Sequence, residues 1–344
     1  MSPKPPSEEA AVRSAIRAGD EAAFAGLAER YRRQLHVHCY RMLGSFDDAE
    51  DLVQETLLRA WRARARFEGR SLFRTWLYRI ATNACLKALA RAPRRVLPQD
   101  VAPPVTATTD VSNARSEPPW APEIPWLQPY PGHLLEPAAP RETEPESTVV
   151  SRETIELVYL AALQHLPARQ RAILILCDAL DWSAKETAGL LGTSVASVNS
   201  ALQRARATMR TRLPAGPRAP AGEEAALLQR FMDAWEQADG AALTALLSDD
   251  ARWAMPPAPL WFDGRGAIEM LFRLFPITAL GGRVRMVPTS ANGQPAAAAY
   301  LQRHGESIGQ LMSLNVLRIA GGAIAEVTTF SLAMLRRFDL PPSL

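Results

Sequence analysis

The sequence predicts a multidomain protein in which two all-α modules joined by a Pro-rich linker precede a C-terminal α+β domain. Apolar residues recur at helical spacing over 8–92 and again over 151–213, where Pro and Gly are scarce. Residues 93–145 contain 13 prolines, and residues 223–340 mix helical with strand-like runs. A chain of 344 residues that is 47% apolar can bury two or three separate cores.

The expected boundaries follow these changes in composition. Proline fixes φ and removes a backbone donor, so the acidic Pro-rich stretch is expected to be a semi-extended linker without a packed core of its own. The predicted parts are a helical module at 8–92, the linker at 93–150, a second helical module at 151–213, a short linker at 214–222 and the α+β domain at 223–340.

The charges of these parts differ in sign. Residues 1–95 carry a net +7, residues 96–150 a net −6, residues 151–220 a net +4 and residues 221–344 a net −2. Two basic modules on either side of an acidic linker suit a partner with many phosphates. Three cysteines without CxxC spacing favour a reducing cytoplasm, and no run of ~20 apolar residues predicts a membrane span.

The first module has an acidic helix face. Ser45 is placed to cap a helix whose apolar stripe leaves Asp48, Asp51 and Glu55 on another side. Such a face is either simply solvated or a docking surface for a basic partner. Nearby, His36 and His38 lie too close along one helix to converge on a tetrahedral metal, so packing roles are expected and no metal or cofactor is predicted.

The next helix, predicted over Arg70–Arg91, has a basic face. Arg79, Asn83 and Lys87 recur every four residues, and a basic loop at 63–71 precedes them. Trp76 and Tyr78 lie among these cations. Aromatic rings between cations suit stacked single-stranded or flipped bases, although a solvated basic helix with core aromatics has the same pattern.

Residues 168–212 predict a helix-turn-helix. A helix is followed by a short helix over 183–192, a turn containing Gly192 and a second helix with a basic end, Ser194–Met209. Recognition helices of this kind enter the DNA major groove.

These motifs occur in the order Asp47-Asp-Ala-Glu-Asp, Phe67-x-Gly-x-Ser71, Thr75–Asn83, Leu166-Pro-x-Arg-Gln-Arg171 and helix-turn-helix. Together they resemble an extracytoplasmic-function (ECF) sigma factor of bacterial RNA polymerase. The resemblance implies a polymerase-docking helix, a module that opens and reads the promoter −10 element, and a helix that reads the −35 element. The polymerase-docking residues would be Asp48, Asp51, Gln54 and Glu55. The −10 residues would be Arg64, Arg66, Ser71, Trp76, Arg79, Asn83 and Lys87. The −35 residues would be Ser197, Asn199, Ser200, Gln203, Arg204 and Arg206.

The recognition helix departs from the family in two positions. Members usually carry a cation where this chain has Asn199 and an arginine where it has Ala201. Asn or Gln pairs bidentately with adenine, so Asn199 and Gln203 are expected at base edges, with Arg204 and Arg206 nearer the DNA backbone.

The C-terminal part resembles a SnoaL-like cone-shaped α+β barrel. A helix pair precedes a Pro-rich aromatic stretch, Trp253–Ile268, and strands are predicted at 283–288, 296–303, 308–319 and 323–330. Trp253, Trp261 and Phe262 are expected in the core or around a ligand-sized pocket. Asp263, His304 and Glu326 are the acid–base candidates by analogy with enzymes of this fold. They have no paired acid–base spacing, so they are expected to be loop or rim residues and the chain is expected not to be an enzyme.

The long linker contains one aromatic segment, Trp120–Tyr130. This segment is expected either to pack locally against a helical module or to anchor the linker on polymerase or on the C-terminal domain.

The predicted function is that of a sigma factor whose partners are core RNA polymerase and promoter DNA, acting in the cytoplasm with no membrane partner, and whose C-terminal domain modulates its activity. The alternative is a helix-turn-helix regulator with a ligand-sensing SnoaL-like domain, which leaves the acidic helix unexplained. A third hypothesis is a SnoaL-type enzyme fused to a DNA-binding module. The sequence leaves open whether a separate anti-sigma factor binds the chain.

Overall fold

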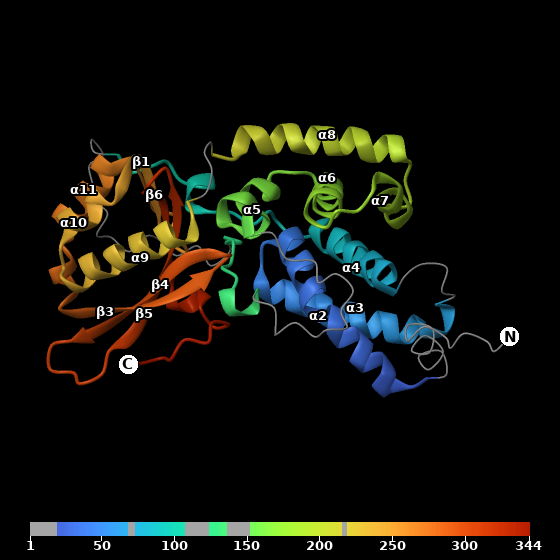
Figure 1. Cartoon of the computed structure of the whole chain (residues 1–344), viewed down its shortest axis with the longest axis horizontal. Coiled ribbons are helices and arrows are strands. Elements are labelled where there is room, and N and C mark those ends of the chain that lie inside the picture. Colours follow the sequence, from blue (N-terminus) through green and yellow to red (C-terminus); the bar gives the residue numbers. More distant parts are fainter. Residues whose placement is uncertain (1–18, 68–72, 107–123, 136–151, 215–218) are drawn as a thin grey trace. The chain divides into compact units, whose positions relative to one another are not determined.

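A computed structural model describes residues 19–67, 73–106, 124–135, 152–214 and 219–344 (Figure 1). The chain forms two compact units. The first contains both helical modules, up to Arg94 and from Ala162 to Leu213. The second contains the linker segments that follow Arg94, residues 152–161 and the C-terminal domain. Among the described residues, no helix is long and apolar enough to cross a bilayer.

The described part of the first helical module contains the helices α2 (Glu21–Leu43), α3 (Phe46–Ala63) and α4 (Phe73–Leu89), with a 3-10 turn at Arg64–Arg66. The predicted cap is present, because the Ser45 hydroxyl accepts the backbone N–H of Asp48 at 3.2 Å. Ala49, Val53 and Ala60 of α3 are buried at helical spacing, as the apolar stripe predicts.

The second helical module contains the predicted helix-turn-helix. Helices α5 (Leu157–Gln164) and α6 (Ala168–Leu174) lead into a π-helical segment, Ile175–Ala179. Helix α7 (Ala184–Leu191) begins with a capping box between Ser183 and Glu186 and ends at Gly192, whose φ of 62° suits glycine. Helix α8 (Val195–Arg212) has Ser194 as its N-cap.

The C-terminal domain is built on a six-stranded sheet in the order β2-β1-β6-β5-β4-β3. Its strands are β1 (Leu247–Ala254), β2 (Trp261–Asp263), β3 (Gly282–Ala291), β4 (Gln294–Arg303), β5 (Gln310–Ala320) and β6 (Ala323–Ser331). All neighbours are antiparallel except β1 and β6, which run parallel. Helices α9 (Ala221–Glu236), α10 (Gly240–Ala245) and α11 (Arg265–Leu274) pack on the sheet around one apolar core.

Strands β3 to β6 correspond to the four predicted strands, whereas β1 and β2 were not predicted. β1 has two exposed acids, Asp249 and Asp250, at its start, which breaks the alternation expected of a strand. β2 has only three residues and follows a Pro-rich turn. Both strands are defined by pairing with each other and, for β1, with β6, and local sequence does not show this pairing.

Parts of the long linker pack within the second unit, which agrees with the expectation that its aromatic segment anchors on the C-terminal domain. Val96 and Leu97 are buried in the second unit, as are Trp126, Leu127 and Tyr130. Val105 adds a backbone bridge to Phe262 of β2, and Val96 forms another with Trp126. Prolines remove donors but leave the intervening residues free to pair, so these segments pack onto a domain built mostly by other residues. Trp120 lies outside the described residues.

Candidate nucleic-acid and partner interfaces

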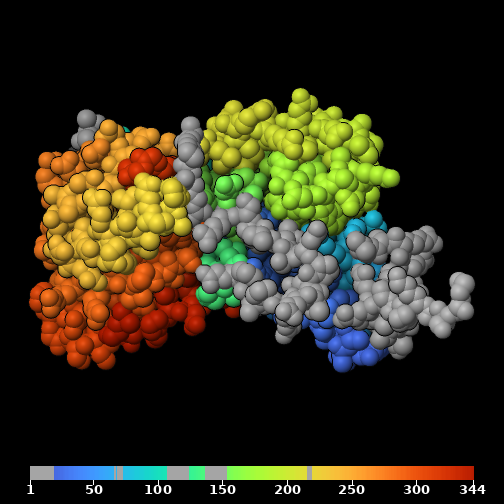
Figure 2. All heavy atoms as spheres, in the orientation of Figure 1, coloured from blue at the N-terminus to red at the C-terminus, as the bar shows by residue number. Residues whose placement is uncertain are grey.

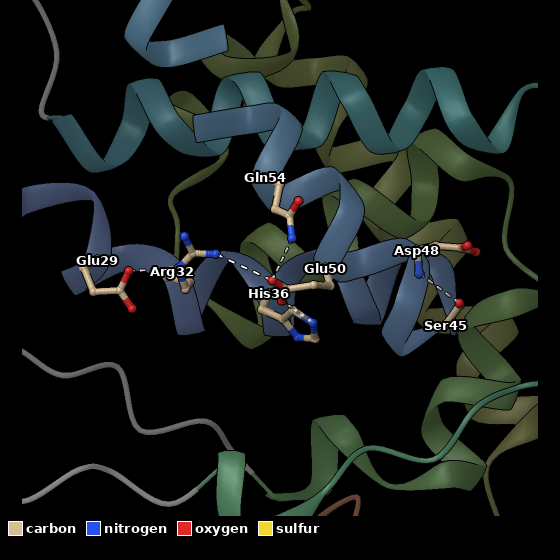
Figure 3. A network of polar contacts seen from close by, with 7 residues as sticks. All are labelled: Glu29, Arg32, His36, Ser45, Asp48, Glu50 and Gln54. Carbon is tan, nitrogen blue, oxygen red and sulfur yellow. Dashed lines mark hydrogen bonds and ion pairs between the residues drawn. The ribbon is translucent and has the colours of Figure 1, made fainter. Parts of the chain in front are cut away.

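The acidic face of α3 is held against α2 by one carboxylate. Glu50 lies 3.6 Å from the guanidinium of Arg32 and 3.5 Å from Nε2 of His36, and it accepts the side-chain amide of Gln54 at 3.3 Å (Figure 3). Arg32 also pairs with Glu29 at 2.8 Å. Glu50 therefore has a structural role, and the neighbouring acids are the ones directed outward.

The predicted docking residues differ in exposure. Asp51, Gln54 and Glu55 are exposed, and Asp48 is half-buried beside the Ser45 cap. Glu55 pairs with Arg59 at 2.5 Å one turn further along the helix. Exposed pairs of this kind stabilise a helix little, so Glu55 can exchange Arg59 for another cation at small cost.

The predicted basic face of α4 is present. Arg79, Asn83 and Lys87 are exposed at successive turns. The guanidinium of Arg79 donates to the carbonyl of Gly189 in α7 at 2.9 Å, a contact that the sequence did not predict.

The predicted aromatic residues of this module divide between surface and core. Trp76 is half-buried, with its ring near those of Phe67 and Phe73. Tyr78 is fully buried, and burial raises the pKa of its hydroxyl to about 12. Arg64 lies 3.9 Å above the ring of Trp61. Ser71 and the side chain of Arg66 lie outside the described residues.

The predicted −35 residues share the exposed side of α8, while Val198, Ala201, Ala205 and Met209 form its buried side. In Figure 2 this helix lies at the surface in yellow-green. The exposed predicted residues are Ser197, Asn199, Ser200, Gln203, Arg204 and Arg206. Ala201 is buried, and Asn199 and Gln203 lie one turn apart on the exposed side.

Two of these six side chains have partners within the module. Arg206 forms a two-point ion pair with Asp178 of the π-helical segment, at 2.9 and 2.6 Å, and this hydrogen bonding raises the pKa of its guanidinium. The hydroxyl of Ser197 accepts a hydrogen bond from Ser194 at 2.9 Å. Asp178 was not predicted, because it lies 28 residues from Arg206 and no local pattern relates the two.

The candidate pocket residues of the C-terminal domain are packing residues. Trp253 is 1% exposed, and its indole N–H donates to Thr329 at 2.9 Å, which in turn donates to Asn315. Phe262 belongs to the same core, and the indole N–H of Trp261 donates to the carbonyl of Ala102 at 2.9 Å.

The acid–base candidates do not share a site. Asp263 lies beside Arg252 at 3.4 Å on the β1–β2 edge, and Glu326 lies beside Arg318 at 3.3 Å between β6 and β5. His304 contacts the Gly281 carbonyl at 2.7 Å.

The two histidines of the first module point to different partners. His38 hydrogen-bonds Thr82 at 2.9 Å, and burial lowers its pKa from 6.5 to about 3. His36 packs against the ring of Phe46 and lies near Glu50. Both therefore have the packing roles expected from their spacing.

A helical module with an acidic face on α3 and a basic face on α4, followed by an exposed recognition helix, is the arrangement of a transcription initiation factor. Comparison with known proteins identifies the family. Residues 27–95 match Sigma-70 region 2, residues 156–209 match Sigma-70 region 4, and residues 228–327 match a SnoaL-like domain. The chain is 43% identical over 328 residues to the ECF RNA polymerase sigma factor SigG of Mycobacterium tuberculosis. The aligned region covers 93% of this chain and 85% of SigG. It is 29% identical over 199 residues to SigW of Bacillus subtilis, covering 58% of this chain and 92% of SigW.

A solved structure has the same fold. The ECF sigma factor SigJ of Mycobacterium tuberculosis superimposes with a TM-score of 0.59 at 20% identity, covering 92% of this chain and all of SigJ. The chain therefore belongs to the ECF RNA polymerase sigma factors, with a SnoaL-like C-terminal domain. It directs promoter-specific transcription initiation by RNA polymerase, and the alternative of a stand-alone regulator is not favoured because region 2 is present.

Proposed function

We propose that α3 docks this sigma factor on core polymerase through Asp51, Gln54 and Glu55, with Asp48 at the edge of the contact. The supporting observation is that Asp51, Gln54 and Glu55 are exposed, while Glu50 is committed to Arg32 and His36. To bind a basic partner, these acids would have to give up only weak, exposed ion pairs.

The −10 element is assigned to the exposed side of α4 and the turn before it. Arg79, Asn83 and Lys87 are spaced to follow a DNA strand, and Trp76 offers a ring on which a base can stack. Arg64, Arg66 and Ser71 complete the set by resemblance.

The −35 element is assigned to α8, and the observation that carries the proposal is the single exposed face shared by all six predicted residues. Asn199 and Gln203 read base edges, with Ser197 and Ser200 beside them. Arg204 contacts phosphate. Arg206 acts in part as a brace, because Asp178 engages its guanidinium.

The C-terminal domain modulates this activity and does not catalyse a reaction. Its β3–β4 hairpin grips two segments that belong to the sigma part of the chain. Asn292 is hydrogen-bonded to Tyr130 of the linker and donates to the carbonyl of Ile155 at 2.9 Å. Gln294 accepts the backbone N–H of Leu157, the first residue of α5, at 3.0 Å.

We name this hairpin contact, formed by Asn292 and Gln294 with Tyr130, Ile155 and Leu157, the amide clasp. Helix N-termini need acceptors for their free N–H groups, and here the acceptor for α5 comes from the C-terminal domain. Helix α5 leads into the helix-turn-helix module. Forming or breaking the amide clasp therefore changes how the first turn of α5, at the start of that module, is held. The domain can thus take the place of a separate anti-sigma factor, and the protein acts in the cytoplasm.

In vitro transcription with core polymerase tests both parts of the proposal. The full-length protein should initiate at its promoter. Truncation after Arg212 and the substitution Trp126→Ala should each change the yield severalfold in the same direction. Asp263→Asn and His304→Ala are the matched controls, because they alter the C-terminal domain away from the clasp. Equal yields from full-length and truncated protein at every concentration would reject the modulatory role.

A further inference from the structure

The recognition helix α8 carries an ion pair that reading the −35 element does not by itself require. Arg206 donates from Nε to one carboxylate oxygen of Asp178 at 2.9 Å and from Nη2 to the other at 2.6 Å. A two-point contact of this kind fixes the plane of the guanidinium as well as its position. The Arg206 side chain is therefore held in one orientation by the protein itself.

The place of Asp178 follows from a local change in the helical pattern. Helix α6 ends at Leu174, and Ile175–Ala179 form a π-helical turn. Such a turn is wider than an α-helical turn, and π-helical turns occur frequently at functional sites. Helix α6 packs against α8. The wider turn changes the direction of the side chains on it, and Asp178 reaches a residue of α8 that lies 28 positions further along the chain.

Arg206 lies on the side of α8 that carries the two predicted base-reading residues. Gln203 is one turn before it and Asn199 two turns before it, so the three side chains neighbour one another along the helix. The Asp178 carboxylate engages the edge of the guanidinium formed by Nε and Nη2. The Arg206 side chain is 55% exposed, which leaves the N–H groups of Nη1 able to donate to a DNA phosphate.

An arginine held in one orientation acts differently on cognate and on other DNA. Non-specific binding is carried by cations that contact phosphates regardless of sequence. A free arginine can follow phosphates to different positions, whereas a held arginine meets the phosphate only where base contacts by Asn199 and Gln203 set the register of α8. On other sequences Asp178 offsets the charge of Arg206 without a compensating contact. Both effects weaken binding to other sequences more than binding to the cognate element.

We propose that Asp178 is a specificity-determining residue for the −35 element. It touches no base and acts through Arg206, which it restrains so that the arginine contacts phosphate only when the base-reading residues are in place. This role rests on the assignment of α8 to the −35 element.

Equilibrium binding of the full-length protein to two duplexes tests the role of Asp178. One duplex carries the −35 sequence that the protein selects from a randomised pool, and the other carries the same bases in scrambled order. Asp178→Asn should tighten binding to the scrambled duplex by about two- to fivefold, the worth of one exposed ion pair, and change the selected duplex less. The slope of log K against log salt for the scrambled duplex should steepen by up to about one counterion. Asp178→Glu keeps the carboxylate and should retain most of the affinity ratio.

Asp181→Asn is the matched control. Asp181 is exposed just beyond the π-helical turn, at a φ of 54° that asparagine also adopts, and its substitution removes the same charge from the module. It should change both affinities alike and leave their ratio intact. In an Arg206→Ala background, Asp178→Asn should no longer change the ratio, because a residue that acts through Arg206 has no effect without it.

An unchanged affinity ratio in Asp178→Asn would overturn the proposed role. So would an equal fall of the ratio in Asp181→Asn, or a fall that persists in the Arg206→Ala background. Weaker binding to both duplexes together with a loss of helical circular dichroism would make Asp178 a structural residue and would also overturn it. If Asn199→Ala and Gln203→Ala leave the −35 preference unaltered, the assignment of α8 fails instead, and that outcome is read from different variants.

Discussion

The side-chain oxygen of Asn292 accepts the backbone N–H of Tyr130 at 2.8 Å, and the backbone N–H of Asn292 donates to the Tyr130 carbonyl at 2.8 Å. Both residues are buried, at 0% and 1% exposure. The Asn292 amide nitrogen continues to the Ile155 carbonyl. Next to Tyr130, Gly132 lies so close to Ser290 that a Cβ would meet the Ser290 backbone oxygen at 2.7 Å. The linker is thus held by hydrogen bonds and by a close backbone approach as well as by apolar burial.

Asn292→Ala should release the linker. It removes the acceptor of the Tyr130 N–H and a donor to the Ile155 carbonyl, and the loss of a buried hydrogen bond costs about 1–3 kcal/mol per group. Hydrogen exchange at residues 126–131 should accelerate, and the free energy of unfolding of the C-terminal unit should fall. Gln310→Ala, which removes an exposed amide from β5, is the control. Unchanged protection at 126–131 in the Asn292 variant would show that the amide does not hold the segment.

Reversal of the α3 acids should block polymerase binding. Asp51→Lys with Glu55→Lys turns an acidic face into a basic one, and like charges facing a basic partner weaken association by several kcal/mol. Co-purification with core polymerase should be lost while circular dichroism stays unchanged. Glu29→Lys changes an exposed acid on α2 and should leave binding intact. Normal co-purification of the double variant would place the dock elsewhere.

On α8, the residues that read base edges should be distinguishable by substitution from the residue that contacts phosphate. Asn199→Ala and Gln203→Ala should each relax preference at one −35 base pair by about 1–3 kcal/mol, because a bidentate contact is lost. Arg204→Ala should weaken all sequences alike and reduce the salt dependence of binding by about one counterion. Thr211→Ala, near the end of the helix, serves as the control. The measurement is equilibrium binding to a panel of −35 duplexes, and an unaltered preference in both amide variants would contradict the assignment.

The stability of the first module should fall between pH 6.5 and 3 partly because of His38. Its folded pKa of about 3 lies below the unfolded 6.5, so in this window the unfolded chain binds a proton that the folded chain does not. The stability is fully present above pH 6.5 and declines by ~1.4 kcal/mol per pH unit as pH falls. His38→Gln should reduce the slope of unfolding free energy against pH by the contribution of about one bound proton. His304→Gln, at an exposed turn, should retain the slope, and equal slopes in the two variants would exclude His38 as its source.

Local pattern predicted the helices and the exposed faces correctly. The cap at Ser45, the apolar stripe of α3 and the turn at Gly192 were predicted from spacing that a single helix determines. The orientation of Asn199 and Gln203 is a consequence of the same periodicity. Strands β3 to β6 were predictable because alternation and Gly-rich turns are also local.

The pairings between distant residues were not predictable. The aromatic segment of the Pro-rich linker was expected to anchor on a helical module, on polymerase or on the C-terminal domain. Its composition could not show that Tyr130 pairs with Asn292, 162 residues away. The same holds for Arg79 with Gly189 and for Arg206 with Asp178. Each joins an ordinary surface residue type to a partner that only the tertiary fold selects.

The parallel pairing of β1 with β6 sets an order of assembly during synthesis. β6 is the strand that joins β1 and β2 to the rest of the sheet, so the C-terminal sheet cannot close before residue 331 has left the ribosome. The recognition helix is complete at residue 212. At ~5–20 residues per second, the DNA-reading modules emerge roughly 6 to 24 seconds before the sheet is closed. Each newly made molecule therefore passes through an interval in which its promoter-reading parts exist without the finished domain that grips them.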